Sequence, residues 1–184
     1  MTTTVPLLAT PGFVLLPGCT ATLFLGPDIL QRQVALSEGW SRLICVIEAG
    51  HYQRERNLVG CLAQVRAVQK LATGWTVQLA GLRRLRIEAE LQTDQGVLIG
   101  GQELASQPWP DGQRPPVIEG LCELVQQFWG RIEVGLWLDM AAFHLPLHAD
   151  TKQFLLCQPD PRLRAELLRN HQSQLEAAPI YSLN

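Results

Sequence analysis

The chain has 184 residues, of which 47% are hydrophobic and 17% are charged, so it can bury a core and is not disordered as a whole. This length suits one ordinary domain, or a compact domain with a second subdomain. The formal net charge of −2 argues against a protein that binds nucleic acid mainly by electrostatic attraction.

The cysteines and the uncharged N-terminal region indicate the compartment. The five cysteines are odd in number and widely spaced, with no Cys-x-x-Cys, which favours reduced, buried thiols over a zinc knuckle or a disulfide framework. Residues Val5–Leu25 carry no charge and are long enough to span a bilayer, but their prolines interrupt any helix. No Lys or Arg precedes them, as a secretory signal requires. We therefore expect a cytoplasmic protein without a membrane segment.

The first residues predict β-structure around a tight turn. The apolar runs Phe13–Leu16 and Ala21–Leu25 flank Pro17-Gly18, a dipeptide typical of turns, and predict two strands after a first strand at Val5–Leu8. Because no charged residue precedes Asp28, this region should lie in the centre of a core. Residues 27–38 predict a helix, with a proline at its first position and a glycine after its end.

Further strands follow at short intervals. Residues 43–47 form a fully apolar run, which predicts a central strand, and the polar stretch Gly50–Asn57 predicts a surface loop. Alternating or apolar patterns predict strands at 59–67, 75–79, 85–87 and 97–104, with a hairpin turn at 72–74 and a break at 81–83.

The second half of the chain changes to a helical period. Four prolines and a glycine within residues 106–116 predict a linker, after which apolar residues predict helices at 117–129, 136–143 and 149–156. Asp160 as N-cap and Pro161 at the first position begin a last helix. We therefore predict a β-rich part at 1–106, a linker at 107–116 and a helical part at 117–184, an α+β arrangement whose sequential short strands suggest a mostly antiparallel barrel or curled sheet.

Three groups of motifs, in this order, resemble the N-terminal substrate-binding (LON) domain of Lon proteases. The first is Val5-Pro6-Leu7-Leu8 with the run ending in Pro17-Gly18 and the strand Leu23-Phe24-Leu25-Gly26. The second is Val59-Gly60 with the strand that contains Gly81-Leu82-Arg83-Arg84-Leu85-Arg86-Ile87. The third combines Leu138-Asp139, Leu145-Pro146-Leu147, Lys152-Gln153-Phe154-Leu155-Leu156 and Asp160-Pro161-Arg162-Leu163.

The resemblance covers almost the whole chain. It implies a PUA-like β-barrel followed by a helical bundle, and a role in binding protein or peptide rather than in catalysis. The chain contains no Gly-x-x-x-x-Gly-Lys motif for an ATPase, so the resemblance implies a stand-alone LON-domain protein. Unfolded or apolar polypeptides are the expected partners, together with a protease for which the chain could act as an adaptor.

The sequence offers weak signals for catalysis. His144 and His148 have the spacing of two metal ligands, but Pro146 breaks the helix between them, so no metal is expected. No serine lies in a Gly-x-Ser-x-Gly elbow, and Lys152 is predicted on an exposed helix, so a serine–lysine pair is disfavoured. We predict no enzyme activity and no cofactor; a small hydrolase with a scattered site is the weaker alternative.

A basic patch leaves an RNA-binding alternative open. Arg83, Arg84 and Arg86, with Arg66, are the nearest approach to such a patch, and PUA-like barrels include RNA-binding modules. The favoured interpretation is that these arginines face solvent or pair with Glu88, Glu90 and Glu103.

Aromatic residues are the candidates for peptide binding. Trp109 lies between two prolines of the linker and is expected to be partly exposed near a groove between barrel and helices. Tyr52, in the predicted polar loop, and Phe13, in the apolar N-terminal run, complete the predicted peptide-binding set.

Overall fold

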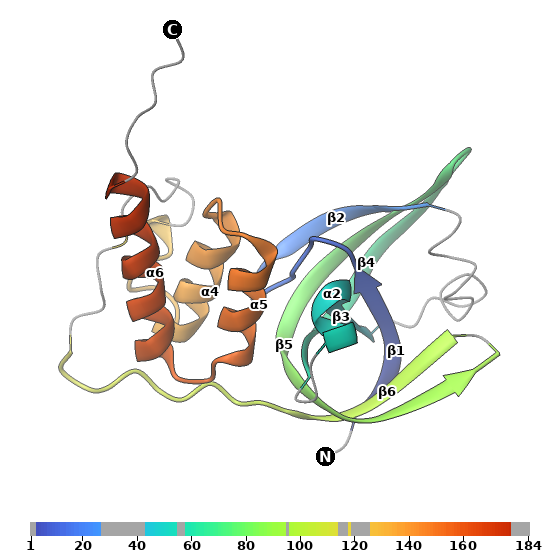
Figure 1. Cartoon of the computed structure of the whole chain (residues 1–184), viewed down its shortest axis with the longest axis horizontal. Coiled ribbons are helices and arrows are strands. Elements are labelled where there is room, and N and C mark those ends of the chain that lie inside the picture. Colours follow the sequence, from blue (N-terminus) through green and yellow to red (C-terminus); the bar gives the residue numbers. More distant parts are fainter. Residues whose placement is uncertain are drawn as a thin grey trace, which may run out of the picture.

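The computed structural model describes residues 3–26, 43–54, 58–94, 96–113, 118 and 126–177. The strands gather in one part of the molecule, and the helices α4, α5 and α6 stand beside them (Figure 1). The expected combination of a mostly antiparallel sheet with helices is therefore confirmed. The helix predicted at 27–38 falls outside the described residues.

Six strands form one sheet in the described part of the chain. They are β1 (Thr3–Thr10), β2 (Thr20–Leu25), β3 (Leu43–Glu48), β4 (Val59–Leu71), β5 (Gly74–Thr93) and β6 (Gly96–Glu103). Their order is β2-β5-β4-β3-β1-β6, and β5 also pairs with β6. The β1–β3 pairing is parallel and the other described pairings are antiparallel. That these strands close into a PUA-like barrel stays a prediction.

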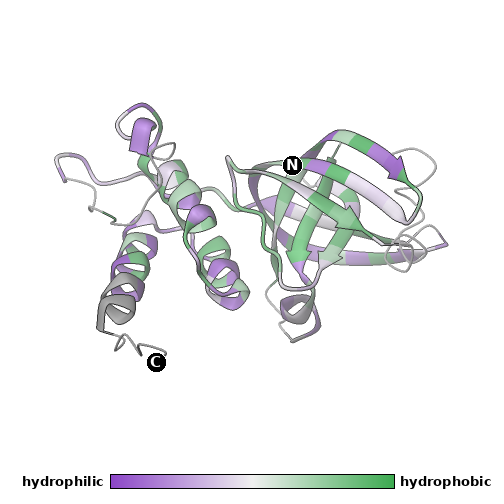
Figure 2. Ribbon diagram, turned by 90° about the horizontal axis from the view of Figure 1, so that it is seen from above, coloured by the Kyte–Doolittle hydropathy of each residue, from purple (hydrophilic) through white to green (hydrophobic). Residues whose placement is uncertain are grey.

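Both faces of the central strands are buried. Consecutive side chains of a strand point to opposite faces, and Cys45 and Val46 of β3 belong to different apolar clusters. The cluster with Val46 extends into α4, α5 and α6, whereas the cluster with Cys45 includes Leu62, Leu85 and Ile99 of the sheet. Figure 2 shows hydrophobic colours along the middle of the strands. This double burial explains the uninterrupted apolar run predicted for β3.

The run Phe13–Leu16 is buried as expected, but it is not a strand. Its last three residues are at most 2% exposed and pack in the core without pairing in the sheet. The run passes close to β5 at Gly81, where a Cβ atom would lie 2.3 Å from the carbonyl oxygen of Leu16. It then ends in the predicted turn, where Gly18 has a φ of 77°. Hydrophobicity therefore predicted the burial of this segment but not its backbone conformation.

Two other local predictions were wrong. Most of the described part of the predicted loop Gly50–Asn57 is helical, in the short helix α2 (Ala49–Arg54) beside β3. The predicted break at 81–83 is a β-bulge within the continuous strand β5: Ala63 pairs with Gly81 and Leu62 with Arg83, so Leu82 is the extra residue. A bulge disturbs the alternation without ending the strand, which is why the pattern resembled a strand end.

The helices after the linker agree with the sequence pattern where they are described. They are α4 (Val134–His144), α5 (Ala149–Cys157) and α6 (Pro161–Ala177). The Asp160 carboxylate accepts a hydrogen bond from the backbone N–H of Arg162 at 2.8 Å, which confirms the predicted N-cap. Helix α4 packs against α5 and α6, and α5 packs against β3 and β4. The helix predicted at 117–129 lies largely outside the described residues, and the domain boundaries stay a prediction.

Buried thiols belong to the core of the sheet. Cys19, Cys45 and Cys61 are free and at most 4% exposed, as the sequence predicted for core cysteines. Burial raises the pKa of all three thiols well above its ordinary value, which disfavours their thiolate forms. No described helix has the length and apolar character needed to cross a membrane.

Candidate functional site

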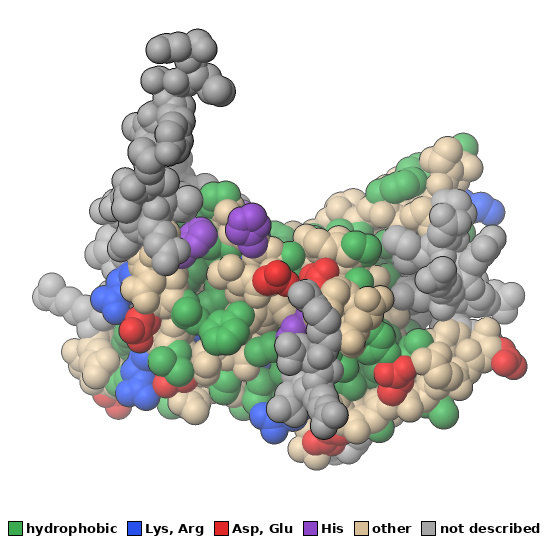
Figure 3. Space-filling model, viewed as in Figure 1, with side chains coloured by type: hydrophobic (Ala, Val, Ile, Leu, Met, Phe, Trp, Pro, Cys, Tyr) green, Lys and Arg blue, Asp and Glu red, His purple; other side chains and the backbone are tan. Residues whose placement is uncertain are grey.

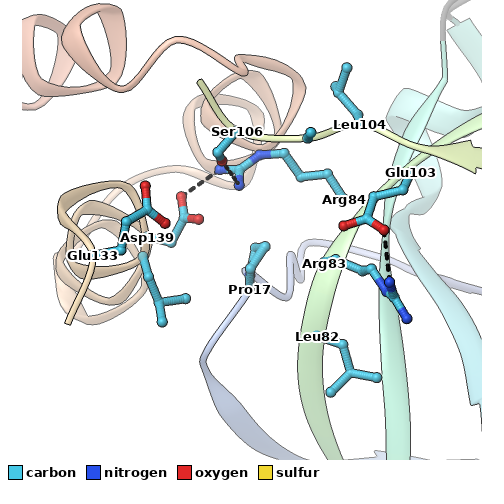
Figure 4. A pocket seen from close by; sticks show the side chains of 11 residues that line it. Pro17, Leu82, Arg83, Arg84, Glu103, Leu104, Ser106, Glu133 and Asp139 are labelled. Carbon is cyan, nitrogen blue, oxygen red and sulfur yellow. Dashed lines mark hydrogen bonds and ion pairs between the residues drawn. The ribbon is translucent and has the colours of Figure 1, made fainter. Parts of the chain in front are cut away.

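A cleft of about 400 Å³ lies where the sheet meets the helical part. Its walls come from β5, from the end of β6 and the segment after it, from the turn before β2, and from α4 with its preceding residue (Figure 4). The lining residues are Pro17, Leu82, Arg83, Arg84, Glu103, Leu104, Ala105, Ser106, Glu133, Leu136 and Asp139.

The strand register explains why the cleft opens at this point. Strand β4 pairs with one edge of β5 along residues 74–86. On the opposite edge, β2 covers β5 residues 75–80 and β6 covers β5 from Leu85 onward. The bulged residue Leu82 and its neighbour Arg83 therefore lie between the ends of two neighbouring strands and line the cleft.

A buried ionic cluster, of which Arg84 and Asp139 line the cleft, lies at its floor. Arg84 of β5, Asp139 of α4 and Arg164 of α6 are 3%, 1% and 1% exposed. Both guanidinium groups donate to the same oxygen, Oδ1 of Asp139, at 2.5 Å. The Ser106 hydroxyl oxygen accepts weaker hydrogen bonds from Arg84 at 3.2 Å and from Arg164 at 3.3 Å. In Figure 4, Arg84 points from β5 toward Ser106 and Asp139.

Backbone carbonyl groups complete the cluster. Arg84 Nε donates to the Leu156 oxygen at 2.9 Å, and Arg164 donates to the Gly135 oxygen at 3.0 Å. Through its bonds to Leu156 and Asp139, Arg84 of the sheet attaches to α5 and α4, and Arg164 attaches α6 to α4. Because each guanidinium group is held by several acceptors, the floor of the cleft should be rigid.

Two positive charges share one negative charge in this cluster. Burial lowers the pKa of the Arg164 guanidinium below its usual range, and the carboxylates of Asp139 and Glu133 oppose this shift. Arg164 Nε is buried and has no hydrogen-bond partner among the described residues. The stability of the cluster therefore depends mainly on Asp139, the carboxylate that both guanidinium groups contact.

The structure separates the three predicted peptide-binding residues. Phe13 and Trp109 are half-buried and pack against the core cluster shared by the sheet and the helices. The ring of Phe13 meets that of Phe143 edge-on, with centroids 6.4 Å apart. Trp109 Nε1 donates to the Gln113 oxygen at 3.0 Å, so the indole is attached to its own linker. Neither residue lines the cleft.

Tyr52 lies on the other apolar face of the sheet. It is half-buried in α2 and packs against the cluster that contains Cys45, not against the cluster of Phe13 and Trp109. Burial and a hydrogen bond with Glu90 raise the pKa of its phenol above the ordinary value. A single peptide site formed by all three aromatic residues is therefore not supported, and a role for any one of them stays a prediction.

The interpretation of the arginines was right for Arg83 and wrong for Arg84. Arg83 is exposed and pairs with Glu103 at 2.7 Å, as expected for a solvated strand face. Arg84 points into the protein and pairs with Asp139. Arg66 and Arg86 are exposed. The RNA-binding alternative loses Arg84, one of the four arginines of the predicted basic patch, because a buried and paired guanidinium group cannot reach a phosphate.

The prediction for Lys152 also needs correction. Its side chain is half-buried rather than exposed: Nζ donates to the Phe143 oxygen at 2.7 Å and lies 5.5 Å from the centre of the Phe143 ring. Burial lowers the pKa of its ammonium group. Lys152 therefore binds a carbonyl at the end of α4. Among the described residues, no group of three or more His, Cys, Asp or Glu side chains could hold a metal ion.

None of the predicted site residues belongs to the ionic cluster, although the sequence contains a signal for it. Asp139 is the single acidic residue in the otherwise largely apolar helix α4. An acidic residue in the middle of an apolar stretch is buried only when a cation pairs with it. This reasoning predicts a buried Arg partner for Asp139, although sequence alone does not identify Arg84 and Arg164.

Comparisons with known proteins concern the fold of the whole chain. No family model and no curated protein matches it. The N-terminal domain of the Mycobacterium avium complex Lon protease superposes with a TM-score of 0.69 at 18% identity, covering 93% of this chain and 98% of that one. A Lon N-terminal domain protein from Xanthomonas campestris gives a TM-score of 0.50 at 21% identity, covering 96% and 99%.

These matches agree with the family that the motifs resemble. Both extend over nearly the full length of each chain, so the sheet and the helices match together. In its fold, the chain is a Lon N-terminal-like domain.

Proposed function

We propose that this chain is a non-catalytic module that binds polypeptides, and that the cleft between sheet and helices is part of its binding surface. The observation that carries the proposal is the Lon N-terminal fold together with a cleft that combines apolar walls and charged rims. We further propose that the sheet forms a PUA-like barrel, that residues 117–184 form the helical part, and that the protein acts in the cytoplasm.

The cleft suits a peptide better than a small charged ligand. Pro17, Leu104 and Leu136 supply apolar contacts beside Leu82, which is 40% exposed. The cleft lining contains charged groups of both signs: two arginines, Arg83 and Arg84, and three acidic residues, Glu103, Glu133 and Asp139. A surface of this kind offers burial to apolar side chains and hydrogen bonds to a peptide backbone without strong attraction for either charge.

The chemistry of the floor argues against catalysis. Among the residues that line the cleft, Ser106 alone carries a hydroxyl group, and its oxygen accepts hydrogen bonds from the guanidinium groups of Arg84 and Arg164. A guanidinium group cannot remove the proton of a serine, since its pKa keeps it protonated. Activation of a nucleophilic serine requires a neighbouring base, so this arrangement supports a structural role for Ser106.

Fluorescence anisotropy with labelled peptides tests the proposal. We expect apolar-rich, uncharged peptides to bind with micromolar Kd, equivalent to about −8 kcal/mol, and composition-matched peptides with serine in place of the apolar residues to bind at least tenfold more weakly. Equal, negligible signals for all peptides at high protein concentration would contradict the proposal.

Two leucines of β5 provide a matched pair of variants for locating the surface. Leu82→Ser changes a cleft residue, and Leu91→Ser changes a residue that is 61% exposed on the same strand but outside the cleft lining. We expect the first variant to weaken peptide binding at least fivefold and the second to leave it unchanged. Equal effects would place the peptide elsewhere.

A further inference from the structure

Among the described residues, no strand pairs with the outer edge of β2. Strand β2 is the terminal strand in the sheet order, and among the described strands it pairs with β5 alone. In Figure 1, β2 runs along the margin of the sheet. A strand in this position exposes a row of N–H and C=O groups that can pair with another extended chain.

The hydrogen-bond phase identifies the unpaired residues. Gly81 N–H donates to the Cys19 oxygen at 2.8 Å, one residue beyond the pair Thr20–Ala80. Hydrogen-bonded and non-hydrogen-bonded pairs alternate along an antiparallel ladder, so Thr20 and Ala80 form no hydrogen bonds with each other. By the same alternation, the pairs Thr22–Gln78 and Phe24–Thr76 are also non-hydrogen-bonded. The N–H and C=O groups of Thr20, Thr22 and Phe24 therefore point away from β5, and the side chains of these three residues are exposed.

The described strand itself carries none of the residues that usually block pairing at an edge. Edge strands of soluble proteins typically carry lysine, proline or other charged residues that block the approach of another strand. The segment Thr20–Leu25 (TATLFL) contains none of these. Its sequence is instead that of a strong β-former.

An apolar surface adjoins one end of this edge. Phe24 is 56% exposed, and its ring lies over Gly74, where a Cβ atom would come within 2.9 Å of Cζ. Leu71 is 37% exposed and lies on the same face, because Leu71 pairs with Gly74 and Phe24 pairs with Thr76. At the other end, the turn at Pro17 leads into the cleft. A peptide along β2 would therefore connect this apolar surface with the cleft.

We propose that β2 binds an extended, uncharged polypeptide segment of a partner protein by strand addition, through the outward backbone groups of Thr20, Thr22 and Phe24. The proposal rests on the proposed function and gives its binding mode. The unpaired groups repeat every second residue, which is the spacing that an extended peptide backbone complements. The absence of charge on the strand and the exposed Phe24 favour apolar side chains in the bound segment.

The shape around β2 favours a flexible segment over a second copy of this chain. In Figure 3 the described surface rises toward the β4–β5 hairpin, and in Figure 1 β2 runs between this hairpin and the helical part. Strands pair about 4.8 Å apart, so the elements on both sides would hinder another folded domain from reaching this edge, whereas an extended peptide fits.

One protein variant tests the backbone contacts. Thr22→Pro removes an outward N–H and leaves the hydrogen bonds to β5 in place. Thr22→Ala is the matched control, because it shortens the same side chain and keeps the N–H. With the apolar peptides described above, we expect Thr22→Pro to weaken binding at least tenfold and Thr22→Ala to change it less than threefold. Thermal unfolding and circular dichroism of both variants check that the fold is retained.

A test with the unchanged protein covers the case in which Thr22→Pro does not fold. Peptides N-methylated at odd positions and at even positions lose opposite sets of N–H donors. Strand addition predicts at least a tenfold difference in Kd between these two peptides, because only one set faces β2. If Thr22→Pro folds and binds normally, or if the two N-methylated peptides bind equally, the proposal is overturned while the proposed function stands. If the wild-type protein binds no peptide, or self-associates through β2 in light scattering so that Thr22→Pro becomes monomeric, the proposal also fails.

Discussion

Replacement of Asp139 by asparagine should destabilise the protein more than any other change in the ionic cluster. Asp139→Asn keeps the size of the side chain and removes the carboxylate that faces Arg84 and Arg164. The two buried guanidinium groups then keep neutral hydrogen-bond acceptors, and Arg164 keeps the weaker attraction of the Glu133 carboxylate. Removal of one partner from a buried ion pair costs about 3–5 kcal/mol, and the sharing of Asp139 places this variant at the upper end of the range.

Arg84→Met should be less damaging, since Asp139 keeps its contact with Arg164 in this variant. The methionine fills most of the space of the arginine stem, but the Leu156 oxygen loses the donor that Arg84 Nε supplies. An unsatisfied buried acceptor costs about 1–3 kcal/mol. The predicted order of the loss in the free energy of unfolding is therefore Asp139→Asn, then Arg84→Met.

The exposed pair Arg83–Glu103 supplies the matched control. Its side chains are 53% and 50% exposed, and its distance of 2.7 Å is close to that of the buried pairs. Glu103→Gln makes the same chemical change as Asp139→Asn, but water screens the charges, so the expected loss is below about 1 kcal/mol.

Equilibrium unfolding in urea at pH 7, followed by tryptophan fluorescence and far-ultraviolet circular dichroism, measures these differences. A domain of this kind has a total stability of about 5–15 kcal/mol, so a loss of about 5 kcal/mol gives a large shift in the midpoint. A loss of less than about 1 kcal/mol for Asp139→Asn, or a larger loss for Arg84→Met than for Asp139→Asn, would refute this role of the shared carboxylate.

Two further predictions concern the core. Gly81→Ala should lower the free energy of unfolding by about 1–3 kcal/mol in the same urea assay, because its methyl group would lie 2.3 Å from the Leu16 oxygen. Gly26→Ala, whose methyl group would meet no atom of the described residues within 4 Å, should change it by less than about 0.5 kcal/mol. Equal effects would contradict the close approach of Leu16 to β5. Because burial raises the pKa of the Cys45 thiol above its ordinary value of 9.0, the unfolded state loses this proton first as the pH rises, and the thiol contributes a fall in stability of about 1.4 kcal/mol per pH unit above pH 9. Between pH 8 and pH 10 the total loss of stability should be smaller by about 1.4 kcal/mol in Cys45→Ala, and an unchanged loss would show that the thiol ionises equally in both states.

Local signals in the sequence determined much of the secondary structure and of the core. The apolar run at β3 reflects burial on both faces of that strand, and the Asp160-Pro161 pair supplies an N-cap followed by a proline that needs no donor. The alternation in β4 predicted the strand, but it suggested burial on one face, whereas residues 59–63 are buried on both. The free edge of β2 could not be predicted from the same signals, because an edge is defined by which strands pair, and pairing depends on contacts distant in sequence.

The tertiary structure alone decided where charge is buried and where the cleft lies. Arg83 and Arg84 are neighbours in sequence, yet one is in solvent and the other pairs with Asp139, 55 residues away. The bulge at Leu82 disturbs the alternation just before them, and the alternation is the property from which orientation would be predicted. The sequence by itself therefore determined that this chain buries a sheet and packs helices beside it. The proposed binding surface depends on which distant strands and charges pair, and no local pattern encodes that pairing.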